Sequence, residues 1–211
     1  PHESGHKKFA LVHNGIIENY ATLKKELIQR GHKFHSDTDT EVLMHLIEDI
    51  HSNSKNKLTL FEAVRIALSE VIGAYAIVVI NKDNPNELIA ARKSSPLVIG
   101  IGDGEFFLAS DATPMVEFTK NVVYLEDGEI AQLSLDAGLK IKTIENQEKT
   151  PYVQELEMQL EALEKGGYDH FMLKEIFEQP QSIHDSMRGR IRSNKGIVSL
   201  GGIKDYEDKI V

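Results

Sequence analysis

The dipeptide Asn14-Gly15 is the first place in the sequence where side-chain and backbone chemistry could combine. It follows the apolar run Phe9–His13, which is typical of a β-strand, and precedes a segment with helical periodicity. Asn-Gly is most often a plain turn. A strand that ends in Asn-Gly and enters a helix, however, leaves a side-chain amide beside a free backbone N–H. Two neutral donors directed at one point are what an oxyanion hole requires, so Asn14 and Gly15 are candidate catalytic residues.

Asp39 is the second candidate, and it lies in the polar run Ser36–Glu41. A helix is expected to begin there because Thr38 and Glu41 have the spacing of a capping box. A carboxylate in the first turn of a helix is stabilised by the helix dipole and often has no other role. A fixed carboxylate could instead receive the ammonium group of a substrate. The spacing leaves both interpretations open.

Nine histidines raise the question of a metal site. His32 and His35 lie at a predicted helix-to-loop junction rather than on one helical face, and no second pair matches them at zinc-finger spacing. The glycines at 100, 102 and 104 lie in and beside a predicted hairpin rather than between a strand and a helix, which argues against a dinucleotide-binding loop. We therefore expect no metal and no cofactor.

Composition excludes several classes of function. The 211 residues include 24 basic and 33 acidic side chains, for a net charge of −9, so a nucleic-acid partner is disfavoured. The absence of cysteine excludes disulfides, thiolate metal sites and a cysteine nucleophile within these residues. No apolar run approaches the length of a membrane span and no signal peptide is evident, so we expect a cytoplasmic protein.

Three helices are predicted in the first third of the chain, each with one buried stripe. Leu23, Leu27 and Ile28 mark the first, which stops at Gly31. The second follows Glu41, with apolar residues at 42, 43, 46, 47 and 50. The third begins after Thr59, which forms another capping box with Glu62 and is followed by apolar residues at 60, 63, 64, 67, 68 and 71.

From Gly73 onward the pattern changes to short strands and turns. Asn81–Glu87 is predicted as a turn cluster, and Asp103-Gly104 and Asp127-Gly128 as type I′ turns of hairpins. The strands are expected at 74–80, 88–92, 97–102, 105–110, 122–125, 129–135 and 139–144. Successive strands joined by short turns are antiparallel. Helices segregated before an antiparallel meander indicate an α+β fold.

The last part of the chain is more polar. An acidic helix is predicted over Tyr152–Leu163, and a further helix around Lys174–Phe177 with a break or kink at Pro180. Residues 193–211 have no strong periodicity and are expected to be a linker. Residues 1–150 are therefore assigned to a core, and residues 151–192 to a helical C-terminal part of the same domain.

Several stretches of the sequence stand out, namely Val12–Asn19, Ser36–Val42, Gly73–Ala76, Ala91-Arg92, Ser95–Gly100 and Ala109–Asp111. In this order they resemble the class II glutamine amidotransferases, whose glutaminase domains have an N-terminal nucleophile. Beyond these, Met172–Pro180 resembles the segment that leads out of this domain in the glutamine–fructose-6-phosphate aminotransferase branch of the family. The resemblance extends from Pro1 to about Arg192.

The resemblance implies a sandwich of four layers, with two antiparallel sheets between helices. It also implies that a cysteine attacks the side-chain amide of glutamine, forms a thioester and releases ammonia, which a separate sugar domain transfers to fructose 6-phosphate to give glucosamine 6-phosphate. The Asn14 side chain and the Gly15 N–H match the oxyanion-hole positions. Asp39 matches the carboxylate that holds the α-amino group of glutamine.

The chain departs from the family at its start, because the family begins with the nucleophilic cysteine. Pro1-His2 matches the end of a His-Pro-His segment, so we expect a fragment that lacks the N-terminal segment of the fold, lacks the sugar domain and is inactive by itself. Exposed sheet surface in such a fragment favours self-association. Another class II amidotransferase, such as the enzyme that makes phosphoribosylamine, and a non-catalytic amino-acid-binding module remain alternatives.

Overall fold

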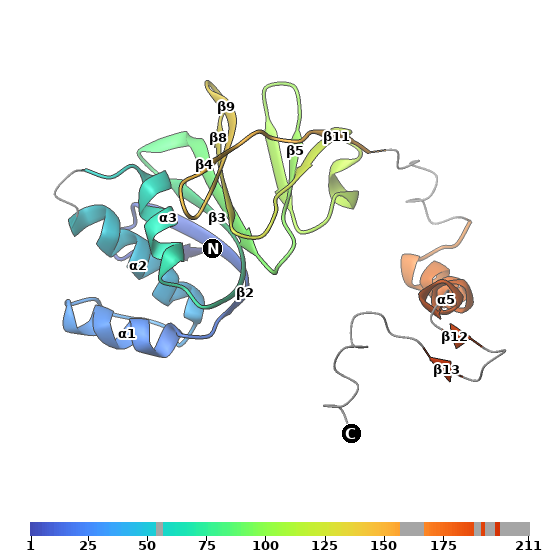
Figure 1. Cartoon of the computed structure of the whole chain (residues 1–211), viewed down its shortest axis with the longest axis horizontal. Helices are drawn as coiled ribbons and strands as arrows, with labels where there is room; N and C mark the ends of the chain where they lie inside the picture. The colour runs from blue at the N-terminus through green and yellow to red at the C-terminus, as the bar shows by residue number, and fades with distance from the viewer. Residues whose placement is uncertain (54–56, 157–166, 188–190, 193–196, 199–211) are drawn as a thin grey trace. The chain divides into compact units, whose positions relative to one another are not determined.

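The computed structural model describes residues 1–53, 57–156, 167–187, 191–192 and 197–198 (Figure 1). The contacts divide the chain into a unit of residues 1–158 and a unit of residues 159–211. In the described part of the first unit, two antiparallel sheets accompany helices α1 (Tyr20–Gln29), α2 (Asp39–Asn53) and α3 (Leu60–Ser69). The predicted α+β fold is confirmed.

The larger sheet has the strand order β1-β2-β3-β4-β8-β9-β10, and the smaller sheet has the order β11-β7-β5-β6. All the pairings within these sheets are antiparallel. The strands of the larger sheet are β1 (His2–Glu3), β2 (Phe9–Ile17), β3 (Gly73–Asn81), β4 (Asn84–Lys93), β8 (Glu129–Ser134), β9 (Gly138–Thr143) and β10 (Glu148–Lys149). Those of the smaller sheet are β5 (Val98–Ile101), β6 (Phe106–Ala109), β7 (Asn121–Tyr124) and β11 (Gln154–Glu155).

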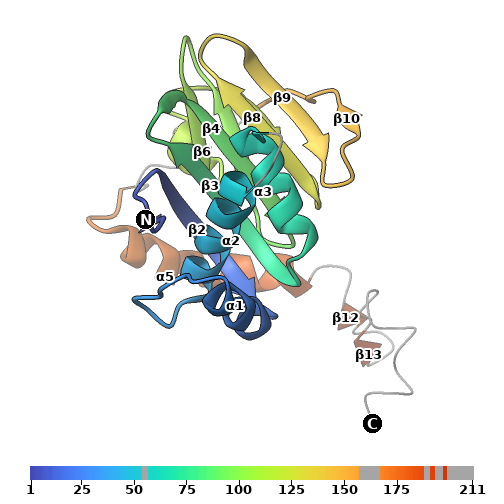
Figure 2. The ribbon, with the colours of Figure 1, turned by 90° about the vertical axis from the view of Figure 1, so that its left-hand side faces the viewer.

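The larger sheet has a different apolar core on each face. Helices α2 and α3 lie across one face (Figure 2), where Leu11, Ile17 and Ile77 pack against residues such as Leu43 and Val64. On the opposite face, a second core joins side chains of both sheets: Ala76, Ala90, Ala131 and Leu133 from the larger, and Ile99 and Val123 from the smaller. Successive residues of one strand thus direct their side chains into the two different cores, because side chains alternate between the faces of a pleated strand. The short 3₁₀ helix η1 (Thr113–Met115) packs on the smaller sheet.

The prediction of a hairpin across Asp127-Gly128 is wrong, because β7 and β8 belong to different sheets. The connection crosses from one sheet to the other, and polar contacts fix it there. Asp127 Oδ1 accepts hydrogen bonds from Arg92 Nη2 at 2.7 Å and from the Ser94 N–H at 2.9 Å. Arg92 Nη1 donates to the Leu125 carbonyl at 2.8 Å. Contacts with Arg92 and Ser94, which are far away in the sequence, therefore hold this Asp-Gly in a crossing between the sheets and not in a hairpin turn.

The other hairpins differ from expectation in their turns. β5 and β6 pair as predicted, but only Gly104, and not Asp103, has a positive φ, so the turn is not type I′. Most of the predicted turn cluster Asn81–Glu87 is strand, because β3 extends through Asn81 and β4 begins at Asn84.

Two of the predicted helical stripes need correction. Ile28 on α1 is 54% exposed, although Leu23 and Leu27 are buried as expected. Helix α2 has no single stripe, since all nine residues from Glu41 to Asp49 are buried. Helix α3 agrees with the prediction, and its first turn is capped by a hydrogen bond from the Glu62 N–H to Thr59 Oγ1 at 3.2 Å.

Toward the end of the chain, Gln154-Glu155 form strand β11 where an acidic helix was expected, and residues 157–166 lie outside the described part. In the second unit, α5 (Phe171–Met187) continues through Pro180, so the helix does not break there, and the alternative of a kink stays a prediction. Strands β12 (Ile191–Arg192) and β13 (Ile197–Val198) pair with each other, within an otherwise undescribed tail. Among the described residues, no helix is both long and apolar enough to cross a membrane.

Candidate functional site

Asn14-Gly15 lies inside strand β2 rather than at its end. The strand continues to Ile17, with Asn14 opposite Ala76 and Gly15 opposite Tyr75 on β3. Gly15 has a φ of +146°, and a Cβ there would lie 2.1 Å from the Ala74 carbonyl oxygen. Only glycine allows the two strands to approach this closely. The prediction that a turn frees the Gly15 N–H is therefore wrong.

The Gly15 N–H nevertheless points to the open edge of β2. The Ser4 N–H donates to the Phe9 carbonyl on the β1 side, whereas the Lys82 N–H donates to the Lys8 carbonyl on the β3 side. Because successive residues of a strand direct their N–H and C=O groups to opposite edges, odd-numbered residues of β2 face away from β3. The described pairing with β1 covers this edge at Ala10 and Leu11, and the Ser4 hydrogen bond extends the cover to Phe9, away from Gly15. Gly15 therefore presents its N–H beyond the covered part.

Asn14 lies next to that edge, on the exposed face of β2. The side chains of Val12, Asn14 and Ile16 alternate with the residues that pack under the helices, and all three are exposed. An exposed amide and an adjacent backbone N–H are the two donors that the sequence suggested, although their source is a strand edge and not a turn.

Asp39 reaches the same edge from the first turn of α2. Its Oδ2 accepts a hydrogen bond from the Ile17 N–H at 2.8 Å, so the carboxylate occupies the edge two residues beyond Gly15. Its Oδ1 accepts a long hydrogen bond from Thr40 Oγ1 at 3.4 Å. The structure thus brings the three predicted site residues to neighbouring positions on one edge, with a carboxylate at one end and amide donors at the other.

His13 is a neighbour of this site that the sequence analysis did not single out. Its Nδ1 lies 3.0 Å from Thr40 Oγ1, which links β2 to the start of α2 a second time. Burial lowers the pKa of His13, and the nearby charge of Asp39 opposes that shift only in part. The lowered pKa favours the neutral imidazole near pH 7, in which His13 brings no positive charge to Asp39.

The loop before α2 is held by Glu41 in a way that departs from a full capping box. The Glu41 N–H donates to Thr38 Oγ1 at 3.3 Å, as predicted. The Glu41 carboxylate instead accepts from the N–H groups of His35 at 2.8 Å and Ser36 at 2.7 Å, and from Ser36 Oγ at 2.6 Å. These bonds outweigh burial and lower the pKa of Glu41. They fix the loop from which Asp39 enters the helix.

Asn19 holds the other end of β2. Its Nδ2 donates to the Glu70 carbonyl at 2.8 Å, and its Oδ1 accepts from the Ile72 N–H at 3.0 Å. The Glu18 N–H donates to the Ile72 carbonyl at 2.8 Å. The chain leaving β2 is therefore fastened to the connection between α3 and β3. Sequence spacing gives no hint of this pairing, because its partners lie about fifty residues away.

Comparisons with known proteins show which family this chain resembles. A model of the glutamine amidotransferase domain family matches residues 1–117. The chain is 58% identical over 211 residues to a Bacteroides thetaiotaomicron protein named glutamine–fructose-6-phosphate aminotransferase [isomerizing], and 56% identical over 210 residues to the Chlorobaculum tepidum protein of the same name. Each alignment covers 100% of this chain and 34% of the relative, so the chain spans about a third of their length.

Solved structures agree on the fold. The glutamine phosphoribosylpyrophosphate amidotransferase from B. subtilis, solved with ADP and GMP, matches with a TM-score of 0.57 and 31% identity, over 68% of this chain and 30% of that one. The predicted sandwich of the N-terminal-nucleophile amidotransferases is therefore confirmed. Together with the domain match over more than half of the residues, this shows that the chain belongs to the glutamine amidotransferase domain family.

Proposed function

We propose that this chain is the glutaminase part of a glutamine–fructose-6-phosphate aminotransferase, which transfers the amide nitrogen of glutamine to fructose 6-phosphate. The observation that carries the proposal is the convergence of Asn14, Gly15 and Asp39 on one open strand edge. The name shared by relatives that align with the whole chain supports the choice of acceptor. The alternative acceptor, phosphoribosylpyrophosphate, is supported by a structural match with lower identity and coverage.

In this proposal the Asn14 amide and the Gly15 N–H stabilise the oxyanion of the tetrahedral intermediate. A thiolate adds to the carboxamide carbon of glutamine, the C–N bond then breaks, and ammonia leaves with an added proton. Water hydrolyses the resulting thioester to glutamate. The 211 residues contain no cysteine, so the proposal requires that the thiol come from sequence outside them. Asn14 and Gly15 would stabilise the oxyanion in the same way, whichever segment of the protein supplies that thiol.

Asp39 is proposed to bind the α-ammonium group of glutamine. One of its oxygens is held by the Ile17 N–H, which fixes the carboxylate in position without neutralising its charge. The first-turn position favours that negative charge. An ammonium bound there lies at one end of the open edge, and the side chain of glutamine would extend along β2 toward Gly15 and Asn14.

We also propose a division of the chain into a core of residues 1–150, a helical part of residues 151–192 and a linker of residues 193–211 that leads to a sugar domain. A cytoplasmic location of the protein is proposed as well. Self-association is also proposed, because the face of β2 that carries Asn14 leaves Val12 and Ile16 50% and 68% exposed.

The test is glutamate release from glutamine by the protein that the native gene encodes, compared with Asn14→Ala and Asn14→Asp. Loss of one oxyanion donor is expected to cost roughly 100- to 1000-fold in kcat. Asn14→Asp keeps the size of the side chain but places a negative charge beside the oxyanion, so it should be no better than Asn14→Ala. Ordinary activity in either variant would refute the assignment of Asn14. An unmodified protein without glutaminase activity would favour an amino-acid-binding module.

A further inference from the structure

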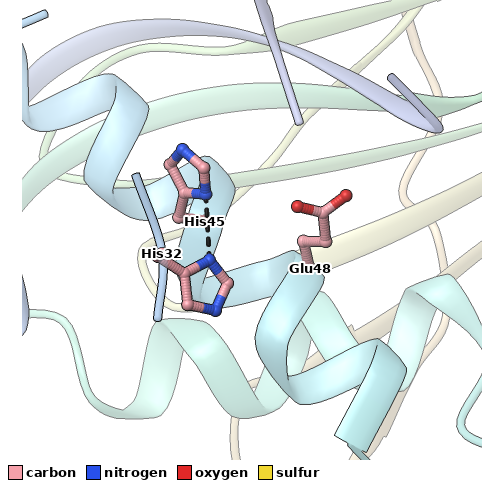
Figure 3. A group of neighbouring side chains, drawn as sticks. All are labelled: His32, His45 and Glu48. Carbon is pink, nitrogen blue, oxygen red and sulfur yellow. Dashed lines mark hydrogen bonds between the residues drawn. The ribbon is translucent and has the colours of Figure 1, made fainter. Parts of the chain in front are cut away.

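A second cluster of polar side chains lies apart from Asn14, Gly15 and Asp39. His32 follows α1, and His45 and Glu48 lie three residues apart on α2, so they share one face of that helix. Their candidate ligand atoms all lie within 4.8 Å of one another (Figure 3). The three residues line a pocket of about 450 Å³ whose lining includes none of the proposed glutaminase residues.

The two imidazoles face each other in an unusual way. His32 Nδ1 and His45 Nδ1 are 3.0 Å apart, as the dashed line in Figure 3 marks. His32 Nε2 lies 3.0 Å from Asp49 Oδ1. Because an ionised carboxylate can only accept a hydrogen bond, His32 Nε2 carries a proton, and in a neutral imidazole Nδ1 then presents a lone pair.

The His45 ring, like that of His32, directs its Nε2 toward a carboxylate. Its Nε2 points toward Glu41, with 3.7 Å between Nε2 and Oε1. A proton on that nitrogen is favoured by the carboxylate, which leaves the Nδ1 lone pair of His45 facing the Nδ1 lone pair of His32. Two lone pairs 3.0 Å apart repel unless a cation lies between or beside them. The side chain of His45 is 4% exposed, so bulk solvent does little to screen that repulsion.

The surroundings of the pair carry excess negative charge. Glu48 is 3% exposed, and its carboxylate accepts from the N–H groups of Gly5 at 2.9 Å and His6 at 3.0 Å. Asp49 is paired with Arg30 at 2.6 Å. The N–H donors at Glu48 stabilise its charge without cancelling it, so a cation would be well placed beside its remaining lone pairs.

We propose that His32 Nδ1, His45 Nδ1 and the Glu48 carboxylate bind one divalent transition-metal ion of the zinc class. The donor set of two imidazoles and one carboxylate suits zinc, with a fourth position left for water. With zinc–nitrogen bonds of about 2.0–2.1 Å, two nitrogens on tetrahedral zinc lie about 3.3 Å apart, close to the separation found here. Asp49 then acts as the carboxylate that orients a ligating histidine.

This inference does not depend on the proposed glutaminase activity. It concerns the junction of the α1–α2 connection, helix α2 and the Gly5–His6 segment, which the ion would tie together. His6 Nδ1 lies 3.1 Å from Glu48 Oε1, and its side chain is 83% exposed, so it is a further imidazole nitrogen beside this carboxylate.

The experiment is titration of the metal-free chain with Zn²⁺ alone and with Co²⁺ alone. Equilibrium dialysis counts the bound ions, and visible absorption of bound Co²⁺ reports tetrahedral coordination. The variants are His32→Asn, Glu48→Gln and Asp49→Asn. His35→Asn is the matched control, because His35 lines the same pocket but lies outside the ligand group. Circular dichroism of each metal-free variant establishes that it is folded.

One Zn²⁺ per chain is expected, with a tetrahedral Co²⁺ spectrum. Asp49→Asn should weaken binding roughly 10- to 100-fold, the usual effect of losing an orienting partner, and His32→Asn and Glu48→Gln should weaken it more. His35→Asn should bind as the unmodified chain does. Absence of saturable binding would overturn the proposal, and would mean that a proton alone bridges the two rings. Binding that survives His32→Asn and Glu48→Gln, or is lost in His35→Asn, would also overturn it.

Discussion

Asp39 accepts a hydrogen bond from the backbone N–H of Ile17 at 2.8 Å, and this contact joins the first turn of α2 to the last residue of β2. The carboxylate therefore has a structural role as well as its proposed role in binding glutamine. Asp39→Asn separates the two, because the amide oxygen can still accept from Ile17 while the negative charge is lost.

For Asp39→Asn we expect a thermal midpoint close to that of the unmodified protein. The KM for glutamine should rise roughly 10- to 100-fold with little change in kcat, since a hydrogen bond to a charged group contributes about 1.5–3 kcal/mol. Asp39→Ala should lose stability as well. Glutaminase kinetics and thermal unfolding of the protein encoded by the native gene provide the measurement. An unchanged KM in Asp39→Asn would show that the carboxylate does not bind the substrate.

Gly15→Ala tests the close approach of β2 and β3. The added Cβ would lie 2.1 Å from the Ala74 carbonyl oxygen, so one of the strands must move. Gly104→Ala is a suitable control, because Gly104 also has a positive φ but a Cβ added there would meet nothing within 4 Å. The control should lose only the roughly 1–2 kcal/mol of left-handed strain.

Urea unfolding of both variants measures the difference. Gly15→Ala should lose clearly more free energy of unfolding than Gly104→Ala. Equal losses would mean that the strands separate at little cost, and that the shape of the edge near Asn14 is less rigid than the contacts indicate.

Asn19→Ala should destabilise the junction of β2 with the α3–β3 connection. It removes two hydrogen bonds, to the Glu70 carbonyl and from the Ile72 N–H, for an expected loss of about 1–3 kcal/mol. The side chain makes no capping bond to α1, so helix capping does not confuse the result. Asn19→Asp should be destabilising too, because a carboxylate cannot donate to Glu70. Stability equal to that of the unmodified chain in both variants would contradict this account.

His13 should make stability depend on pH. Burial lowers its pKa below the ordinary value of 6.5, so between these two values the unfolded chain binds a proton that the folded chain does not. Stability from this group is therefore present above pH 6.5 and is lost as the pH falls through the folded pKa. His51, whose pKa is lowered by burial and then by Lys8, should act in the same direction.

The measurement is the free energy of unfolding between pH 5 and pH 7.5 in a buffer with a chelator. His13→Gln and His51→Gln should each lose less stability on acidification than the unmodified chain. A pH profile that neither substitution changes would show that both imidazoles can be protonated in the folded state at no cost.

Local features of the fold could be predicted where the deciding contacts are local. The Thr59 cap and the apolar stripe of α3 lie within one helix, and the β5–β6 hairpin is decided by a few neighbouring residues. Asp127-Gly128 has the same local pattern, yet Arg92 and Ser94 hold it between two sheets. The choice between a hairpin and a crossing thus depends on residues about 35 positions away, which periodicity does not reveal.

The candidate site residues could be named from the sequence, but their geometry could not be predicted from it. Asn14-Gly15 was expected to end a strand, whereas pairing of β2 with β3 carries the strand past both residues. The neighbourhood of His32 was missed for a similar reason. His45 and Glu48 have helical spacing, but only the packing of α1 against α2 brings His32 to them, and a single sequence does not show that packing.

The exposed face of β2 leads to a prediction about self-association. Ile16 is 68% exposed and Val12 50%, on a sheet face whose neighbouring strands bury Ala76 and Ala90 in the core between the sheets. An apolar strand that is unpaired along part of one edge and uncovered on one face is a favourable contact surface for a second copy. Ile16→Lys should therefore shift self-association to higher concentration, because it places a charge in the contact. Ile28→Lys is the matched control, since Ile28 is 54% exposed on α1, away from this face.

Sedimentation velocity over a concentration series distinguishes the possibilities. The unmodified chain and Ile28→Lys should associate over the same concentration range, and Ile16→Lys only at higher concentration. An unmodified chain that remains monomeric throughout would refute self-association. Equal effects of the two lysine substitutions would mean that general charge, and not the face of β2, controls it. If Ile16→Lys alone associates only at higher concentration, the strand that carries Asn14 is the contact between copies. Association of two copies would then obstruct the proposed glutamine site.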